Sequence, residues 1–190
     1  MDPRVEEDPR AEADCTLFEI HDSVAIITIN RPHALNAMNG AVRAALFAAF
    51  ERVERDAAIV AAILTGAGER AFCAGVDLKE AAEMQLAVPP NLGSRANVRS
   101  VCGVEVGFVN RVVAPDALLQ SAMEMADCIV RNTPLTVRAA KELLRIATEP
   151  GRSAALRSAN NLFERVYRSA DAQEGPLAFR EKRTPRWQGQ

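Results

Sequence analysis

The stretch Ala71–Phe72–Cys73–Ala74–Gly75–Val76–Asp77–Leu78 decides the fold of this 190-residue chain. It follows an apolar run, Val60–Leu64, and a glycine-containing turn, Thr65–Gly68. It precedes Lys79–Glu83, a segment compatible with a helix. This order predicts a strand, then a loop of small residues, then the start of a helix.

The loop is predicted to hold negative charge. A helix start leaves backbone N–H groups without acceptors, and such groups bind oxyanions. Gly75 lets a ligand approach the backbone because no Cβ stands in the way. We therefore predict that the N–H of Val76 is half of an oxyanion hole. For Asp77, which lies at the helix start, the alternative role is capping or stabilisation of the helix dipole.

The preceding residues predict a ββαβ unit. Two β-branched apolar segments, Thr16–Ile20 and Val24–Asn30, are separated by a short turn and predict a hairpin. Asn39 suits the N-cap of a helix that runs from residue 40 to about residue 56. A third strand, Ile59–Leu64, then leads the chain into the loop at Gly75.

The C-terminal part is predicted to be helical. One helix runs from Pro115 to about Arg131, a second from Thr133 to Pro150, and a third from about Ser153 to Ser169. The apolar stripe of the first consists of Leu118, Ala122, Met125 and Ile129. Such stripes favour the core or a subunit interface over a ligand site.

Composition indicates a single globular domain. The chain is 48% hydrophobic and 25% charged, and its net charge of −2 gives no reason to expect nucleic acid or an anionic membrane as a partner. No apolar run reaches membrane-spanning length. Residues 1–14 are too acidic for a transit peptide and lack the apolar stretch of a secretion signal, so we expect a disordered acidic tail and a cytoplasmic protein.

Cysteine and histidine provide no metal cluster. The four cysteines (Cys15, Cys73, Cys102 and Cys128) form no CxxC pair, and the chain has two histidines. We predict reduced, mostly buried thiols and no bound metal.

Three pieces, taken in order, resemble the crotonase superfamily of enoyl-CoA hydratases and isomerases: Ile29–Pro32 with Asn36–Met38, then Leu64–Gly66, then Phe72–Leu78. Each motif alone is weak, but their order makes the set specific. Two further segments resemble the family near the C-terminus: Gly103–Val113, and Asp171–Phe179 with Glu181–Pro185.

The resemblance implies an α/β fold, in which a crotonase-type ββα spiral is followed by a C-terminal helical region. It implies an acyl-CoA thioester as substrate and no cofactor apart from that coenzyme A. The Val76 N–H would donate to the thioester oxygen, and the Ala74 carbonyl would meet the adenine. The remaining residues implied on the CoA side of this loop region are Arg31, Ala34, Asn36, Gly75 and Asp77. For Arg31 the alternative is a solvated turn arginine.

Phe179 and Lys182 are implied near the C-terminus. They are three positions apart on a predicted short helix, so they would share a face. In relatives an aromatic residue and a lysine here cover the adenine and meet phosphate, often from a neighbouring subunit. The resemblance accordingly implies a homo-oligomer, a trimer or hexamer. The alternative is a packed phenylalanine beside a solvated lysine.

The interval between Asp77 and Gly107 is shorter than in the family, at 30 positions. In relatives it carries further spiral turns, a glycine-rich loop with the second oxyanion N–H, and the catalytic glutamates. We therefore predict a truncated spiral core over 15–113, with an irregular loop at about 84–102. A helical trimerisation and CoA-covering region follows over 114–190.

The short interval bears on activity. Hydration needs a base, a proton source and a polarised thioester oxygen. Glu80 and Glu83 are expected in solvent and Glu105 at an exposed position, so hydratase or isomerase activity is predicted to be weak or lost. Three possibilities stay open: an enzyme of this class, a non-catalytic acyl-CoA binder, and an internally deleted product or interaction subunit stabilised by intact homologues.

Overall fold

The computed structural model describes residues 15–83, 109–148 and 152–189. The predicted tail 1–14 and the predicted loop 84–102 lie outside these residues, as does most of the segment 103–113. Strands and helices both occur, which confirms the predicted α/β class.

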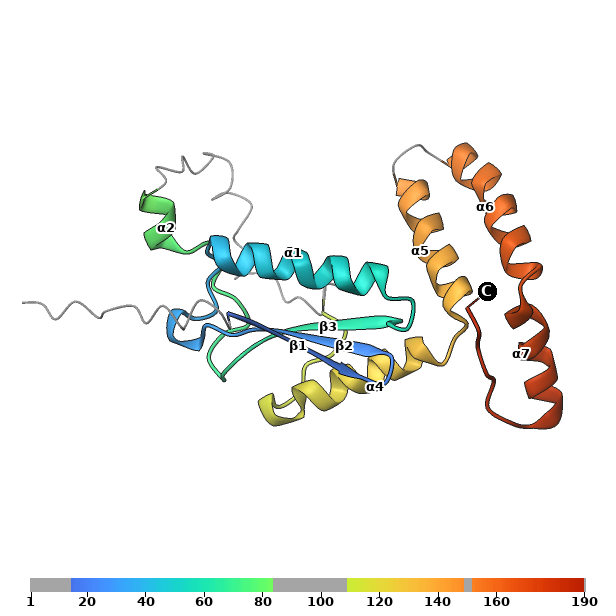
Figure 1. Ribbon diagram of the computed structural model, residues 1–190, viewed down its shortest axis with the longest axis horizontal. Helices are drawn as coiled ribbons and strands as arrows, with labels where there is room; N and C mark the ends of the chain where they lie inside the picture. The colour runs from blue at the N-terminus through green and yellow to red at the C-terminus, as the bar shows by residue number, and fades with distance from the viewer. Residues whose placement is uncertain (1–14, 84–108, 149–151, 190) are drawn as a thin grey trace, which may run out of the picture.

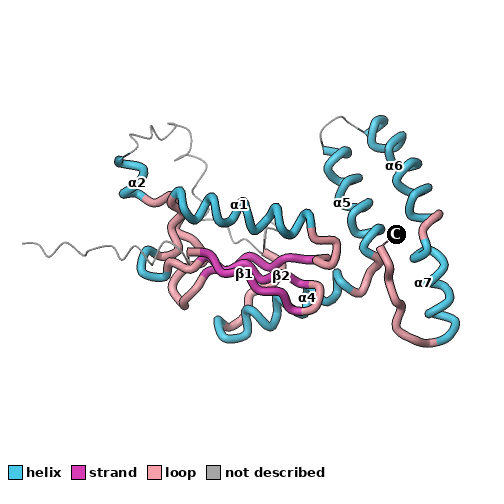
Figure 2. The backbone as a smooth tube through the Cα atoms, in the orientation of Figure 1, coloured by secondary structure: helices cyan, strands magenta, loops and turns pink. Residues whose placement is uncertain are grey.

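One three-stranded sheet forms the centre of the fold, in the order β1-β2-β3 (Figure 2). The predicted hairpin is confirmed as β1 (Thr16–His21) and β2 (Val24–Ile29), which pair antiparallel. The turn is possible because Asp22 adopts a positive φ of 52°, which aspartate tolerates. β3 (Ala61–Gly66) pairs parallel to β2 and begins two residues later than predicted. Its start is delayed because the Ile59 N–H donates to the Asp56 carbonyl in the preceding turn.

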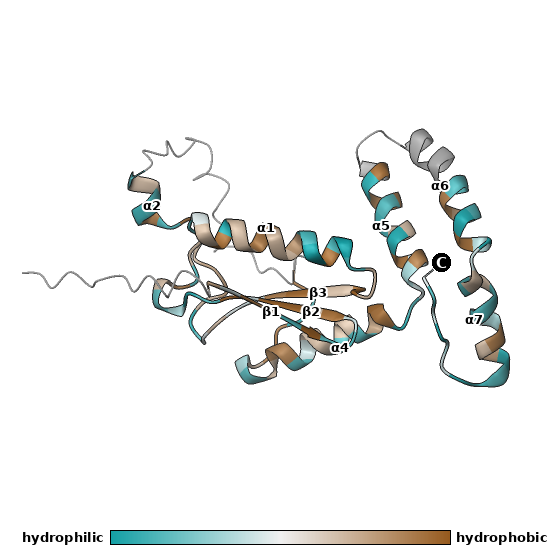
Figure 3. Ribbon diagram, in the orientation of Figure 1, coloured by the Kyte–Doolittle hydropathy of each residue, from teal (hydrophilic) through white to brown (hydrophobic). Residues whose placement is uncertain are grey.

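The helix α1 (Gly40–Arg55) covers one face of the sheet. Its N-cap is Asn39, as predicted, whose side chain accepts a hydrogen bond from the Val42 N–H at 3.0 Å. The core between helix and sheet consists of Cys15, Ile27, Ile29, Val42, Leu46 and Ala49. Figure 3 shows hydrophobic colour along the strands and on parts of α1.

The opposite face is covered by α4 (Leu118–Val130), which follows a 3₁₀ turn η3 (Pro115–Ala117) (Figure 1). The predicted helix is present, but its predicted apolar stripe is not its buried face. Leu118, Met125 and Ile129 are exposed, whereas the buried residue of α4 is Ala126. A residue as small as alanine lets the helix backbone lie close to the sheet.

Three further helices stand beside this layered unit: α5 (Pro134–Thr148), α6 (Arg152–Tyr167) and α7 (Ala170–Glu181). α5 starts where predicted. α6 ends two residues earlier than predicted because Ser169 is the N-cap of α7 and accepts a hydrogen bond from the Ala172 N–H.

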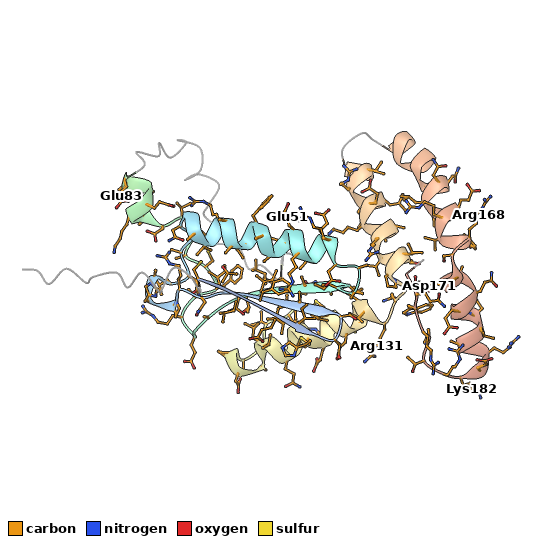
Figure 4. All side chains as sticks on the ribbon, viewed as in Figure 1. Glu51, Glu83, Arg131, Arg168, Asp171 and Lys182 are labelled. Atoms are coloured by element: carbon orange, nitrogen blue, oxygen red, sulfur yellow. The ribbon has the colours of Figure 1, made fainter. Side chains whose placement is uncertain are left out.

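The chain returns after α7 and is fastened by Asp171, which is 2% exposed. Its carboxylate accepts hydrogen bonds from the N–H groups of Gln188 at 2.6 Å and Gly189 at 3.0 Å. It also accepts one from the Thr133 hydroxyl at 3.2 Å, at the junction of α4 and α5. Asp171 thus joins α7, this junction and the C-terminal segment, and Figure 4 shows it between them.

A second carboxylate, Glu174, fixes the turn that follows α7. Both of its oxygens accept from the Arg183 guanidinium, at 2.5 and 2.9 Å. The Arg186 N–H donates to it as well, at 2.6 Å. The hydrogen bonds from Arg183 first, and from Arg186 second, lower the pKa of Glu174 to about 2.

The described cysteines only partly fit the sequence prediction. Cys15, Cys73 and Cys128 are free thiols, but Cys15 is buried, Cys73 half-buried and Cys128 exposed. Cys102 lies outside the described residues. Within those residues no group of histidine, cysteine and carboxylate side chains is arranged to hold a metal ion, and no helix has the length and apolar character needed to cross a membrane.

The lowered pKa of Glu174 predicts a pH dependence of stability. Because the folded-state pKa of about 2 lies below the ordinary value of 4.5, this contribution is present above pH 4.5 and is lost as the pH falls toward 2. Urea unfolding measured across this range should show that Glu174→Gln removes part of the acid dependence. Glu164→Gln, which alters an exposed ion pair on α6, is the matched control and should leave the pH profile unchanged. Identical profiles for wild type and Glu174→Gln would contradict the assignment.

Candidate functional site

The loop at Val76 is held by the loop that follows β2. Met38 and Val76 form an isolated parallel bridge. The Met38 N–H donates to the Gly75 carbonyl at 2.8 Å, and the Asp77 N–H donates to the Met38 carbonyl at 3.1 Å. In a parallel bridge of this kind the N–H of the central residue points to the other side. The Val76 N–H accordingly has no acceptor among the described residues, and Val76 is 51% exposed.

Open space lies beside this donor. Gly75 has a φ of 97°, and a Cβ built on it would meet no atom of the described chain within 4 Å. The backbone conformation therefore favours glycine, and the space beside Gly75 is open among the described residues. The Gly75 N–H is occupied, since it donates to the Cys73 sulfur at 3.3 Å. Val76 thus supplies the free donor of this pair.

Arg31 and Asp77 are paired with each other. The guanidinium Nη1 of Arg31 donates to Asp77 at 2.9 Å and to the Ala37 carbonyl at 2.7 Å. Both side chains are largely buried, so Arg31 is not a solvated turn arginine. The hydrogen bond from Arg31 is the main cause that lowers the pKa of Asp77 below its usual range. Asp77 also accepts from the Lys79 N–H at 3.0 Å, the capping role considered for it.

Asn36 is the buried link between the two loops, at 1% exposure. Its side-chain oxygen accepts from the Arg31 N–H at 3.0 Å. Its amide nitrogen donates to the carbonyls of Ala67 at 2.9 Å and Ala71 at 2.8 Å. Both amide hydrogens are used internally, so the side chain has no donor left for a ligand.

Gly66 makes this arrangement possible. A Cβ there would lie 2.3 Å from the Phe72 carbonyl oxygen and 2.7 Å from the Asn36 amide nitrogen. The family-like segment Leu64–Gly66 therefore needs glycine for a close approach of backbone to side chain.

The two alanines differ in what their carbonyls can do. Ala34 ends the 3₁₀-helix η1 (Pro32–Ala34), and its carbonyl accepts from the Ala37 N–H at 3.0 Å. Ala74 is exposed, and its carbonyl accepts no hydrogen bond among the described residues. Ala74 thus offers a free acceptor two residues from the free donor of Val76.

The structure does not bring Phe179 and Lys182 to this loop. α7 lies at the opposite end of the molecule from α2 (Leu78–Glu83), which follows Val76 (Figure 1). Figure 4 shows the same separation between Lys182 and Glu83. Phe179 is 88% exposed on α7, whereas Lys182 is the residue after the helix, with a φ of 55°. The prediction that both share one helix face is wrong, because the left-handed conformation at Lys182 ends the helix.

Glu80 lies in a different environment from the one that the sequence predicts. It was expected in solvent, yet its side chain is 17% exposed and bonded to the start of α1. No local pattern signals this contact, because its partner lies 40 positions earlier.

Comparison of this chain with known protein families identifies its family. The enoyl-CoA hydratase/isomerase family model matches residues 19–99 and 92–190. The chain belongs to this family, which confirms the resemblance to the crotonase superfamily.

Individual relatives agree with the family match. The chain is 29% identical to a carnitinyl-CoA dehydratase of Proteus mirabilis, over 252 aligned positions that take in 88% of this chain and 95% of the relative. The crystal structure of an enoyl-CoA hydratase from Mycobacterium tuberculosis superposes with a TM-score of 0.81 at 27% identity, covering 93% of this chain and 99% of that one. The 252 aligned positions exceed the 190 residues present here, so the dehydratase carries residues without a counterpart in this chain.

The contacts of Asn36 predict a large effect of a nearly isosteric change. Asn36→Asp would turn a donor toward two carbonyls into a negatively charged acceptor, and we expect the free energy of unfolding to fall by roughly 2–4 kcal/mol. Urea unfolding monitored by circular dichroism measures this.

Asn132→Asp is the matched control. The side-chain amide nitrogen of Asn132 also donates to a backbone carbonyl, that of Cys128 at 2.7 Å, but this contact lies at an exposed helix end. Water can replace that contact, so a loss below about 1 kcal/mol is expected. Equal losses in the two variants would show that Asn36 is not the link between the loops.

Proposed function

We propose that this protein binds acyl-CoA thioesters at the Val76 loop and that the Val76 N–H donates to the thioester oxygen. The observation that carries this proposal is the free N–H beside open space at Gly75. A thioester oxygen gains negative charge when its acyl group is enolised, so a fixed N–H donor favours it. Names of similar proteins, such as the carnitinyl-CoA dehydratase, agree with a CoA thioester as ligand.

The predicted CoA-side residues take different parts in this proposal. Ala74 would accept from the adenine through its free carbonyl, and Gly75 would let the ligand reach the backbone. Arg31, Asn36 and Asp77 would act by holding the loop, since their side chains bond to one another and to backbone groups. Ala34 and its neighbours would form the wall on the CoA side. No cofactor other than the CoA of the substrate belongs to the proposal.

We further propose that hydratase or isomerase activity is weak or lost. Hydration needs two proton-transfer groups near the α- and β-carbons of the acyl chain. The described carboxylates closest in sequence to Val76 are engaged elsewhere, Asp77 with Arg31 and Glu80 with α1. The excess of aligned positions over chain length supports an internal shortening, which we place between Asp77 and Gly107. Loss of one oxyanion donor costs about 10²–10³ in rate.

A homo-oligomer, a trimer or hexamer, completes the proposed site. Phe179 and Lys182 lie far from the Val76 loop of their own chain (Figure 1). They could cover adenine and phosphate only at the loop of another copy. Exposed apolar side chains on the same group of helices, among them Leu144, Phe163 and Tyr167, suit an interface. The free thiols of the described cysteines fit the proposed cytoplasmic location.

One observation favours a second candidate, an interaction subunit stabilised by intact homologues. The residue pair Ile27 and Leu64 shares one face of the sheet, but α1 covers Ile27 and leaves Leu64 exposed. On α1, Phe47 is 68% exposed and Phe50 is exposed as well.

The three exposed apolar side chains lie on the same side of the unit formed by α1 and the sheet. The Arg52 guanidinium sits 4.3 Å from the ring centroid of Phe18, which places the flank of α1 that carries Arg52 over β1. Phe50 is on the opposite flank of the helix, toward β3. Phe47, Phe50 and Leu64 therefore form an apolar strip over β3 that another subunit could cover.

The binding proposal is tested by removing the N–H. Val76→Pro lacks the donor and removes no N–H that the Met38 bridge uses, while Val76→Ala keeps the N–H. Titration calorimetry should show that Val76→Pro lowers the affinity for butyryl-CoA about 2- to 10-fold, with the affinity for free CoA retained. Val76→Ala should behave as wild type. No binding of butyryl-CoA to the wild-type protein would overturn the proposal.

The shared site is tested by mixing two variants that each bind acyl-CoA more weakly. Phe179→Ala and Lys182→Ala should each weaken CoA binding, and co-refolding Phe179→Ala with Val76→Pro should restore part of the acyl-CoA binding. Recovery requires that loop and α7 come from different copies. A monomer with full affinity, measured by light scattering and calorimetry, would contradict this arrangement.

Two assays separate the alternatives. Rapid loss of the enone absorbance of crotonyl-CoA would show an active hydratase and contradict the predicted loss of activity. A chain that binds no CoA and is soluble only when co-expressed with a full-length homologue would favour the interaction subunit. For an interaction subunit, Leu64→Ser should abolish the rescue by the homologue. For a protein that binds acyl-CoA, Leu64→Ser should leave CoA binding unaltered.

A further inference from the structure

The helix α2 follows Val76, and few contacts with the other described residues hold it in place. It has six residues, Leu78–Glu83, and none of them is buried. A helix this short is unstable by itself in water, because it cannot recover the cost of nucleation. Its position, and with it one end of the Val76 loop, must come from tethers to the rest of the molecule. One tether is the pair of Arg31 and Asp77 described above.

Glu80 forms a second tether, to the start of α1. Its Oε1 accepts a hydrogen bond from the Gly40 N–H at 2.6 Å. Gly40 is the first residue of α1, where a backbone N–H has no partner within the helix. Asn39 already satisfies the Val42 N–H. The two side chains therefore divide the capping of α1 between a local residue and one from α2.

Arg43 extends this tether to the bridge that holds Val76. Its Nη1 lies 3.0 Å from Oε2 of Glu80, an ion pair without an aligned hydrogen bond. The Nη1 of Arg43 also donates to the Met38 carbonyl at 3.2 Å. The same carbonyl accepts the Asp77 N–H that closes the Val76 bridge. Glu80 and Arg43 thus connect α1, α2 and both strands of the bridge.

We infer that Glu80 is a positioning residue that, through Gly40 and Arg43, fixes the direction of the Val76 N–H. It touches no proposed ligand and acts only through the backbone it holds. A hydrogen bond to a thioester oxygen weakens steeply when the donor is misaligned, so mobility of α2 would reduce polarisation of that oxygen. The inference rests on the proposed binding site for its effect on the ligand, but its effect on the free protein is separate.

The geometry offers a test from each side of the contact. A Cβ at residue 40 would lie 2.9 Å from the Glu80 Oε1, at the flexible end of that side chain. Gly40→Ala should therefore displace the carboxylate while leaving the helix intact, since alanine favours helix more than glycine does. Glu80→Gln keeps an acceptor for the Gly40 N–H but removes the charge that attracts Arg43, whereas Glu80→Ala removes both. Glu83→Gln is the matched control, on the same helix but exposed.

The first measurement uses the free protein. Amide relaxation by NMR should give a lower order parameter at Val76 in Glu80→Ala and Gly40→Ala, an intermediate value in Glu80→Gln, and the wild-type value in Glu83→Gln. An unchanged order parameter at Val76 in both Glu80→Ala and Gly40→Ala would overturn the inference. This outcome does not depend on whether acyl-CoA binds.

The second measurement reports on the ligand. In isotope-edited infrared spectra, the carbonyl band of bound butyryl-CoA should move toward its position in water for Glu80→Ala, and the preference for butyryl-CoA over CoA should fall roughly 2- to 10-fold. A general loss of fold would lower both affinities together, so retained CoA binding separates positioning from unfolding. If the wild-type protein binds no butyryl-CoA, the proposed function fails, while the order parameters still decide the role of Glu80.

Discussion

The fold around the site depends on the side-chain amide of Asn36. It satisfies three backbone groups that belong to two loops, one after β2 and one after β3. These loops follow neighbouring parallel strands, so their ends meet at the same edge of the sheet. Leu35 and Asn36 both adopt positive φ values, of 51° and 56°, which a leucine rarely does. The buried hydrogen bonds of Asn36 are made in this strained conformation and help to offset its cost.

This link explains how a flexible-looking sequence of small residues becomes a fixed donor. Met38 is brought alongside Val76, and the bridge uses the N–H groups on either side while leaving that of Val76 free. Charged side chains then hold the outside of the loop, with Arg31 on Asp77 and Glu80 on the start of α1. Polar side chains that resemble ligand contacts in the sequence are therefore mostly bonded to the protein itself. Two backbone groups of this loop, the N–H of Val76 and the carbonyl of Ala74, have no partner in the part of the chain that the structure describes.

Much of this fold could be predicted from local sequence. The hairpin, the Asn39 cap, α1 and the start of α5 follow from alternation, capping and helical period, which are properties of neighbouring residues. The errors have local as well as tertiary causes. β3 begins later than predicted because of the turn at Asp56. The buried residue of α4 is Ala126 and not a member of the predicted stripe, and α7 ends before Lys182. In each case a tertiary contact or a local chain reversal outweighed a periodic pattern.

The sequence by itself determined the family and the location of the loop. The reason is that its motifs contain Gly66, where a Cβ would collide with neighbouring atoms, and Gly75, whose positive φ favours glycine. The tertiary structure alone decided which side chains are free. In it, the side chains of Arg31, Asn36 and Asp77 bond to the protein itself, and Glu80 accepts a hydrogen bond from Gly40. Phe179 and Lys182 belong to the region of α7, at the end of the molecule opposite α2. The physical reason is that a hydrogen bond or ion pair joins residues near in space, and their separation of tens of positions leaves no trace in a local pattern.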